Sequence, residues 1–339
     1  MLKDIIAVVC LLAICSIGHA QVGGQRSYEF LNIPYSARTS GLGGVNVSLA
    51  DVDLNMVYSN PALTSDTLSG HLSFNYLSYF ADINSFSFVY QHDFGKYGEW
   101  FFGANHFDYG TIESFDNTGA DLGEVESGET VVYLGRSHSI AHFTVGATFK
   151  FVNSSIAGYT SNALAMDIGG VFKHPSQKFT TGLVFKNIGL VTSQYTDTDE
   201  AKLPFDVQFG ASFKPSHMPF RFSFTGYNLY QRDVSYYDPA QMPADDKPGA
   251  FDKIFRHIVI GTELLLTKNV NLRMGYNHLI RQELKLENTS GGAGFSFGLM
   301  FRIKAFEFAY SRGGYHVAGG SNNFTLTANT NLFFRKGKL

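Results

Sequence analysis

The chain is poor in cysteine, in charged residues and in long apolar runs. Its 339 residues include two cysteines, Cys10 and Cys15, both near the N-terminus. If that segment is removed on export, the mature chain can form no disulfide, no thiol nucleophile and no cysteine–zinc site. Charged residues make up 16% of the chain and the net charge is -3, without a long basic run, which argues against nucleic acid as a partner.

The first twenty residues have the pattern of an export signal. Lys3 precedes an apolar run over 5–14, and Gly18 and Ala20 place small residues at the two positions that a signal peptidase reads. The run is shorter than the roughly 18 residues that a membrane-spanning helix needs, and no later run approaches that length. We expect residues 1–20 to be a signal peptide cleaved after Ala20; a retained membrane anchor is the alternative.

Glycine and aromatic residues are abundant instead, with 35 Gly, 18 Tyr and 32 Phe, a composition that favours strands and tight turns. Residues 142–151 read HFTVGATFKF, so Phe149 and the other phenylalanines fall on one side of an extended strand and Lys150 on the other. Residues 205–214 and 270–277 alternate in the same way. About fourteen such segments follow one another, beginning near Leu72, Phe86, Trp100, Val131, Phe143, Leu164, Phe179, Phe205, Phe220, Ile258, Val270, Phe295, Phe306 and Phe324.

The connections between these segments differ in length. Those after even-numbered segments are short, at 94–97, 137–141, 174–177, 215–218, 267–269 and Lys304. Those after odd-numbered segments are mostly longer, as at 110–128, 189–203, 231–254 and 278–292. An even number of strands of about ten residues, with short turns at one end and long loops at the other, is typical of outer-membrane barrels.

These patterns predict an all-β fold, a 14-stranded antiparallel transmembrane β-barrel over residues 67–339. The apolar face of each strand would contact lipid, and the face rich in Gly, Ser, Thr and Asn would line the lumen. We therefore expect Phe149→Arg to be costly and Lys150→Gln to be tolerated. A soluble β-rich periplasmic protein also alternates in this way and is the alternative.

Residues 21–66 lack this alternation and are rich in small and apolar residues. We call this segment the hatch and expect it to fold into the lumen as a small plug; a short periplasmic tail is the alternative. Its recognisable plug motif comprises Gly43, Gly44, Asp51, Asn60, Pro61 and Ala62.

Motifs for catalysis are weak. Residues 294–298 read GFSFG and match the G-x-S-x-G elbow of serine hydrolases, but the motif needs a turn between strand and helix, whereas Ser296 lies in the middle of a predicted strand. The histidines are dispersed, without metal-binding spacing. We expect no enzymatic activity and no cofactor.

Two further sets of residues are candidates for binding. Arg38, Arg256 and Arg273 are possible lumen charges, which could pair with carboxylates of the hatch or bind an anionic ligand. Tyr195, Tyr236, Tyr237 and Asp238 lie in two of the long connections, where amphipathic aromatic residues could bind a partner protein. Ordinary loop packing is the alternative for the second set.

Several short strings carry a resemblance to known families. Leu42-Gly43-Gly44, Ala50-Asp51 and Asn60-Pro61-Ala62-Leu63 resemble the N-terminal hatch of the long-chain fatty acid transporter barrels, whose fold has fourteen strands. An ordered set over the mature chain resembles the PorQ family of the type IX secretion system, within the same superfamily. Its strings are Gly23-Gly24, FLNIP at 30–34, Ser36-Ala37-Arg38, Leu203-Pro204, RHIVIGTE at 256–263 and LRMGYN at 272–277.

The resemblance implies a non-catalytic component of the bacterial outer membrane. Such a barrel is a platform for the attachment complex, in which a sortase, a sister barrel and a surface-exposed partner attach secreted cargo proteins to lipopolysaccharide. Outer-membrane lipid and lipopolysaccharide would surround it. The alternative function is an outer-membrane transporter of hydrophobic compounds such as long-chain fatty acids, which would need an apolar pocket beneath the hatch.

Overall fold

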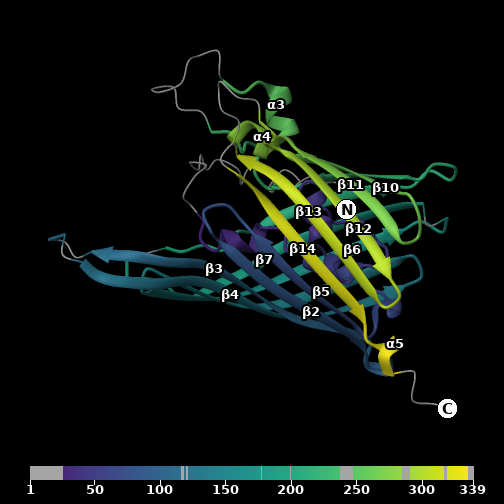
Figure 1. Ribbon diagram of the computed structural model, residues 1–339, viewed down its shortest axis with the longest axis horizontal. Helices are drawn as coiled ribbons and strands as arrows, with labels where there is room; N and C mark the ends of the chain where they lie inside the picture. Colours follow the sequence, from purple (N-terminus) through teal and green to yellow (C-terminus); the bar gives the residue numbers. More distant parts are fainter. Residues whose placement is uncertain are drawn as a thin grey trace, which may run out of the picture.

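A computed structural model describes residues 26–115, 118–119, 121–176, 178–198, 200–236, 247–284, 291–316 and 319–334. These residues form a closed antiparallel barrel of fourteen strands, in which β1 pairs with both β2 and β14 (Figure 1). The strands are β1 (His71–Ser78), β2 (Asn84–Asp93), β3 (Glu99–Phe115), β4 (Asp121–Ile140), β5 (Phe143–Ile156), β6 (Tyr159–Lys173), β7 (Phe179–Ser193), β8 (Asp206–Phe213), β9 (Phe220–Gly226), β10 (Ile258–Leu265), β11 (Val270–Asn277), β12 (Phe295–Ile303), β13 (Phe306–His316) and β14 (Gly319–Asn329).

The barrel confirms the predicted fold and the predicted facing of the strands. In β5, the Phe149 side chain is 65% exposed on the outer face, whereas Thr148 is 3% exposed and points into the barrel. The same alternation holds in β8 and β11. Since a barrel wall has only two faces, the exposed phenylalanines of these strands lie on the outer one, whereas a few aromatic side chains such as Phe101 and Phe107 of β3 are buried on the lumen side. An outer face of exposed phenylalanine suits lipid and would be unfavourable in water.

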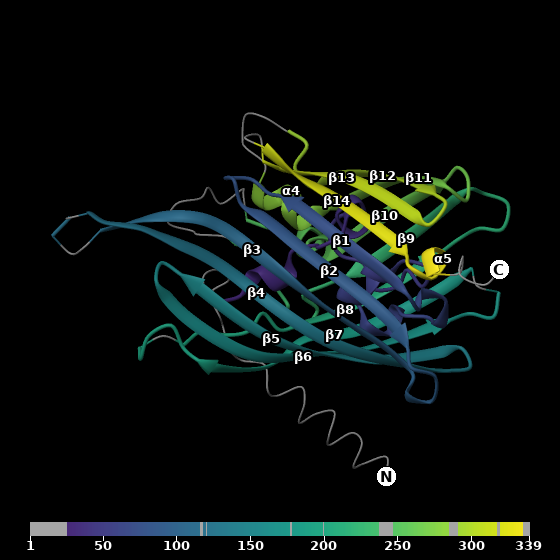
Figure 2. The ribbon, with the colours of Figure 1, turned by 60° about the horizontal axis from the view of Figure 1, so that its bottom comes forward.

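Two predicted loops are partly strand in the structure. The segment 110–128 was expected to be a long connection, but β3 runs to Phe115 and β4 begins at Asp121. Past the residues that pair with β2 and β5, strands β3 and β4 pair only with each other, from Thr111↔Glu126 to Ser114↔Gly123. This part projects from the barrel as a ribbon (Figure 2). Mutual hydrogen bonding is sufficient to extend a hairpin past the barrel rim. In the second predicted loop, β7 continues to Ser193.

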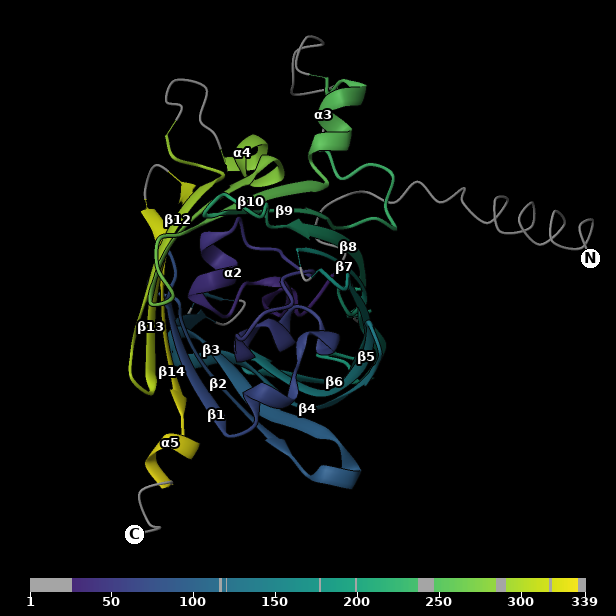
Figure 3. The same cartoon turned by 90° about the vertical axis from the view of Figure 1, so that its right-hand side faces the viewer.

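Short helices complete the fold. The hatch and the link to β1 contain η1 (Glu29–Asn32), α2 (Ala37–Gly41), η2 (Leu54–Tyr58), η3 (Pro61–Leu63) and η4 (Asp66–Leu68). A view into the ring of strands shows α2 inside it (Figure 3). Outside the ring are η5 (Gly95–Tyr97), α3 (Ala250–Phe255), α4 (His278–Leu284) and α5 (Asn331–Phe334). Among the described residues, no helix has both the length and the apolar character to cross a membrane.

The two ends of the barrel are distinct. The connections after odd-numbered strands, with α3 and α4, lie at one end, which we call the outer end. The turns after even-numbered strands lie at the other end, where the hatch also leads into β1. This arrangement places the start of β1 and the finish of β14 together, as expected for an even-stranded antiparallel barrel.

Candidate functional site

The hatch turns sharply after α2 and docks on the barrel wall there. The Ser36 hydroxyl caps α2 by accepting a hydrogen bond from the Thr39 amide. Gly43 then adopts φ +95°, a conformation that favours glycine, and a Cβ there would overlap Val259 of β10. The Gly43 amide donates to Ser296 Oγ at 3.0 Å. Ser296 of the GFSFG motif therefore faces the lumen and holds the hatch.

A second turn of the hatch docks on the opposite part of the wall. Asn60 caps η3 through Oδ1, which accepts from the Ala62 amide at 3.0 Å, and Pro61 occupies the first position of that helix. Asn60 Nδ2 donates to the Val47 carbonyl at 3.1 Å, which closes the hatch on itself. Gly169 of β6 lies against Asn60, and a Cβ there would overlap Oδ1. A wall residue without a side chain lets the turn approach this closely.

Arg38 of α2 is the centre of a buried ion network. Its guanidinium donates to both carboxylate oxygens of Glu263 in β10, at 3.0 and 2.9 Å. It also donates to Asp51 at 3.0 Å and to Asp53 at 3.3 Å, both in the hatch. The Arg38 side chain is 5% exposed and that of Glu263 is 1% exposed. Bidentate geometry and exclusion of water make such contacts strong once formed.

Two wall arginines complete this network. Arg221 of β9 and Arg273 of β11 lie directly opposite Glu263 on the two neighbouring strands. Arg221 Nη1 contacts Glu263 Oε2 at 2.9 Å and Asp51 Oδ2 at 2.5 Å, and Arg273 Nε contacts Glu263 Oε1 at 3.2 Å. Three arginines therefore meet three carboxylates. The balanced charges fasten the hatch to β9, β10 and β11.

The ionisation of Asp51 follows from this network. Burial raises the pKa of the Asp51 carboxyl, but Arg38 and Arg221 outweigh burial and hold that pKa well below its usual range. The native state therefore favours the ionised form. The resulting stability is present above the usual pKa of an aspartate and is lost only as the pH falls through the lowered pKa. The hatch is thus fastened at neutral and mildly acidic pH.

A separate ion pair lies in the wall on the other side of the lumen. Lys150 Nζ of β5 contacts Asp167 Oδ2 of β6 at 2.6 Å and donates to Asn187 Oδ1 at 2.9 Å. The side chains of Lys150 and Asp167 are both at least nine-tenths buried. Removing the lysine would leave a buried carboxylate without its cation. This pair argues against the tolerance that we expected for Lys150→Gln.

The structure separates the three predicted lumen arginines. Arg38 and Arg273 both belong to the hatch network. Arg256 instead follows α3 at the outer end and pairs with Asp252 of the same helix at 2.7 Å, so it is not a member of that network. The sequence alternation places Glu263 and Arg221 on the lumen face, but nothing local to either strand indicates that they meet Arg38.

The predicted loop aromatics also have different surroundings. Tyr195 is half-buried, donates to Ser154 Oγ at 2.6 Å and stacks on Tyr28 of the hatch, so it packs inside the outer end of the barrel. Tyr236 is 58% exposed. Tyr237 and Asp238 lie outside the described residues.

Spaces lined by the described residues differ between lumen and exterior. A space of about 30 Å³ borders the hatch near Asn55 and Lys186, and one of about 240 Å³ lies near Asp53, Arg302 and Glu307 at the short-turn end. Two spaces of about 570 and 460 Å³, lined mainly by apolar side chains, lie on the outer face of the wall. In the part of the chain that the structure describes, no three His, Cys, Asp or Glu side chains gather to hold a metal.

The known proteins that resemble this chain are solved structures of outer-membrane channels, porins and related proteins. No family model and no curated protein matches the chain. One similar solved structure is the CymD monoaromatic hydrocarbon channel, with a TM-score of 0.46 and 11% sequence identity over 87% of this chain and 96% of that chain. Another is the TodX monoaromatic hydrocarbon channel deltaS2 mutant, with a TM-score of 0.47 and 12% sequence identity over 88% of this chain and 97% of that chain. The Acinetobacter baumannii outer membrane protein Omp33 has TM-score 0.37 and 8% identity over 76% and 96%. At this level the likeness extends to the kind of fold and no further.

Proposed function

We propose that this protein is a plugged barrel of the bacterial outer membrane that serves as a non-catalytic platform for the type IX secretion attachment complex. The PorQ-family resemblance suggests the complex, and the aromatic outer face supports the membrane location. The observation that carries the platform role is the network around Arg38, which ties the hatch to three wall strands. A lumen closed in this way suits a scaffold better than a channel.

Helix α3 supplies a surface for a partner protein at the outer end. Phe251 is 80% exposed and Ile254 is 58% exposed, so the helix presents large apolar side chains to its surroundings. Polar contacts hold the other side of the helix in place: Asp252 contacts His278 of α4 at 2.8 Å, and Lys253 pairs with Asp233. A rigid support with projecting apolar residues is typical of an interface core.

The alternative of transport receives less support from the geometry. A carrier of hydrophobic compounds needs an apolar path past the hatch, whereas the spaces beside the hatch are small or lined by charged and polar groups such as Asp53 and Lys186. The larger apolar spaces lie on the lipid side of the wall. Movement of the hatch would first have to break the ion network.

Affinity purification tests the proposal. The tagged barrel is purified from outer membranes in mild detergent, and its companions are identified by mass spectrometry. We expect recovery of the sortase, the sister barrel or the surface-exposed partner, and at least a tenfold loss in a Phe251→Ser, Ile254→Ser double variant, since interface-core residues commonly contribute more than 1 kcal/mol each. Phe94→Ser is the matched control, because Phe94 is 56% exposed at the opposite end of the barrel.

The other outcomes are equally informative. Recovery of the unaltered barrel alone would overturn the platform role, and a co-purified hydrophobic compound in that preparation would support transport. Recovery that falls equally in the Phe94→Ser control would contradict the assignment of α3 as the docking surface.

A further inference from the structure

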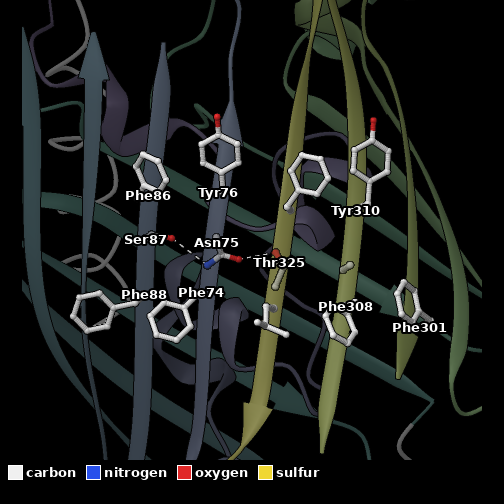
Figure 4. A pocket seen from close by; sticks show the side chains of 13 residues that line it. Phe74, Asn75, Tyr76, Phe86, Ser87, Phe88, Phe301, Phe308, Tyr310 and Thr325 are labelled. Carbon is white, nitrogen blue, oxygen red and sulfur yellow. Dashed lines mark hydrogen bonds between the residues drawn. The ribbon is translucent and has the colours of Figure 1, made fainter. Parts of the chain in front are cut away.

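An apolar groove of about 570 Å³ crosses the outer face of β12, β13, β14, β1 and β2 (Figure 4). Strand register places its side chains in two rows. The row nearer the outer end consists of Phe86, Tyr76, Phe324 and Tyr310, on β2, β1, β14 and β13 in that order. In the next row, the short side chain of Leu326 lies between Phe74 and Phe308. The groove is lined mainly by the apolar side chains of these two rows.

The groove has one polar end. Tyr76 donates its hydroxyl to Asn84 Oδ1 at 2.7 Å, and Tyr310 donates to Asn322 Oδ1 at 2.8 Å. Both hydroxyls point toward the same end of the groove (Figure 4). Tyrosines with apolar rings and hydrogen-bonded hydroxyls mark the boundary between hydrocarbon and head groups in membrane barrels. The boundary here is the one at the outer end.

A cation lies just beyond that boundary. Register places Arg312, Asn322, Ser78 and Asn84 side by side in the next row toward the outer end. Arg312 is exposed on the outer face, and its Nη1 donates to Asn322 Oδ1 at 3.3 Å, the oxygen that also accepts from Tyr310. The acidic residue of the same row, Asp108, is four strands away on β3, at roughly 19 Å by the usual strand spacing.

We propose that this groove binds one lipid of the outer leaflet, with an acyl chain between the two aromatic rows and a head-group phosphate on Arg312. Arginine binds phosphate with two parallel hydrogen bonds, and a site at the membrane boundary is only partly screened by water. The proposal rests on the membrane location proposed above and not on the partner surface of α3.

The barrel offers an internal control. A second outer groove of about 460 Å³ is lined by Phe149, Phe151 and Leu164, among others, on β4 to β7. The row beyond it toward the outer end consists of Thr130, Asn153 and Asn162, all uncharged. The two grooves share apolar walls and polar rims, but only the first has a cation on its outer rim. Lys150 also borders the second groove, but its side chain pairs with Asp167 on the lumen side. Only the first groove should therefore bind a phosphorylated lipid more tightly than a dephosphorylated one.

Native mass spectrometry of the purified full-length barrel tests this inference. The probes are lipid A that carries its phosphates and the same lipid after enzymatic dephosphorylation. We expect the unaltered barrel to bind the phosphorylated probe about tenfold more tightly than the dephosphorylated one, because one charge-assisted hydrogen bond contributes roughly that much. This preference should vanish in Arg312→Gln. Arg312→Lys should retain part of it, and Asn153→Arg should add a second site.

Each outcome decides the inference. Equal binding of the two probes by the unaltered barrel would overturn it, as would an unchanged preference in Arg312→Gln. Weaker binding of both probes in Phe74→Ala, with binding unaltered in Phe149→Ala, would place the acyl chain in the first groove, and the reverse result would contradict that placement. A heat-dependent shift on electrophoresis establishes that each variant is folded. Partner recovery in the α3 experiment is a separate readout, so failure of either proposal is recognisable by itself.

Discussion

The two halves of the barrel wall hold the hatch in different ways. Strands β3 to β7 have 14 to 20 residues, and their lumen face meets the hatch through close backbone approach, as at Gly169. Strands β8 to β12 have seven to nine residues, and three of them supply the charged row of Arg221, Glu263 and Arg273. Close contact positions the hatch on both sides, at Gly169 of β6 and at Gly275 of β11, and the charged row is an additional attachment on the second side.

The largest effect on stability is expected at the centre of the charged row. Glu263→Gln keeps the shape of the side chain but leaves Arg38 and Arg273 buried without their shared anion. We expect a loss of about 3 to 5 kcal/mol in the free energy of unfolding, measured by urea titration in detergent micelles, together with faster proteolysis of the hatch.

Glu307→Gln is the control for the charged row. Glu307 contacts Arg302 at 2.6 Å, but the Arg302 side chain is 40% exposed, so we expect a loss within about 1 kcal/mol. A loss of that size in Glu263→Gln as well would show that the network does not fasten the hatch.

The next effect concerns the outer face of the long-strand half. Phe149 is central in β5 and points outward, so Phe149→Arg should cost about 2 to 4 kcal/mol of unfolding free energy in bilayer vesicles. Ser155→Arg, on the same strand and face but close to the outer end, should cost about 0 to 1 kcal/mol, because a long cation there reaches the head groups. Equal costs for the two variants would contradict the position of the membrane.

The smallest effect tests close approach between hatch and wall. Gly169→Ala places a methyl group against Asn60, and the overpacking should cost about 1 to 3 kcal/mol in the same urea titration. Gly170→Ala, one residue along β6, has open space around the new Cβ and should change stability by less than about 0.5 kcal/mol. If the two alanine variants were equally stable, the hatch would not be seated against β6.

Much of the wall was predictable because strand alternation is a local property. Successive side chains of an extended strand point to opposite faces whatever the strand pairs with, so residues 142–151 alone place Phe149 and Lys150 on opposite faces. Which of the two faces meets lipid followed from the whole set of strands and connections. The number of strands followed from the number of alternating segments. The β3–β4 ribbon was not predicted, since its glycines and acidic residues have low strand propensity and only pairing between the two strands orders them.

The sequence by itself thus determined the class of fold, the count of strands and the lipid-facing side of the strands. Only the tertiary structure decided which charges meet. Arg38 and Glu263 are 225 residues apart, and their contact depends on the path of the hatch and the register of three strands at once. The sequence analysis placed Arg256 and Arg273 in the same set of possible lumen charges. Arg256 nevertheless pairs with Asp252 of α3, whereas Arg273 pairs with Glu263 in the buried row, because an arginine pairs with whichever carboxylate the folded chain brings near.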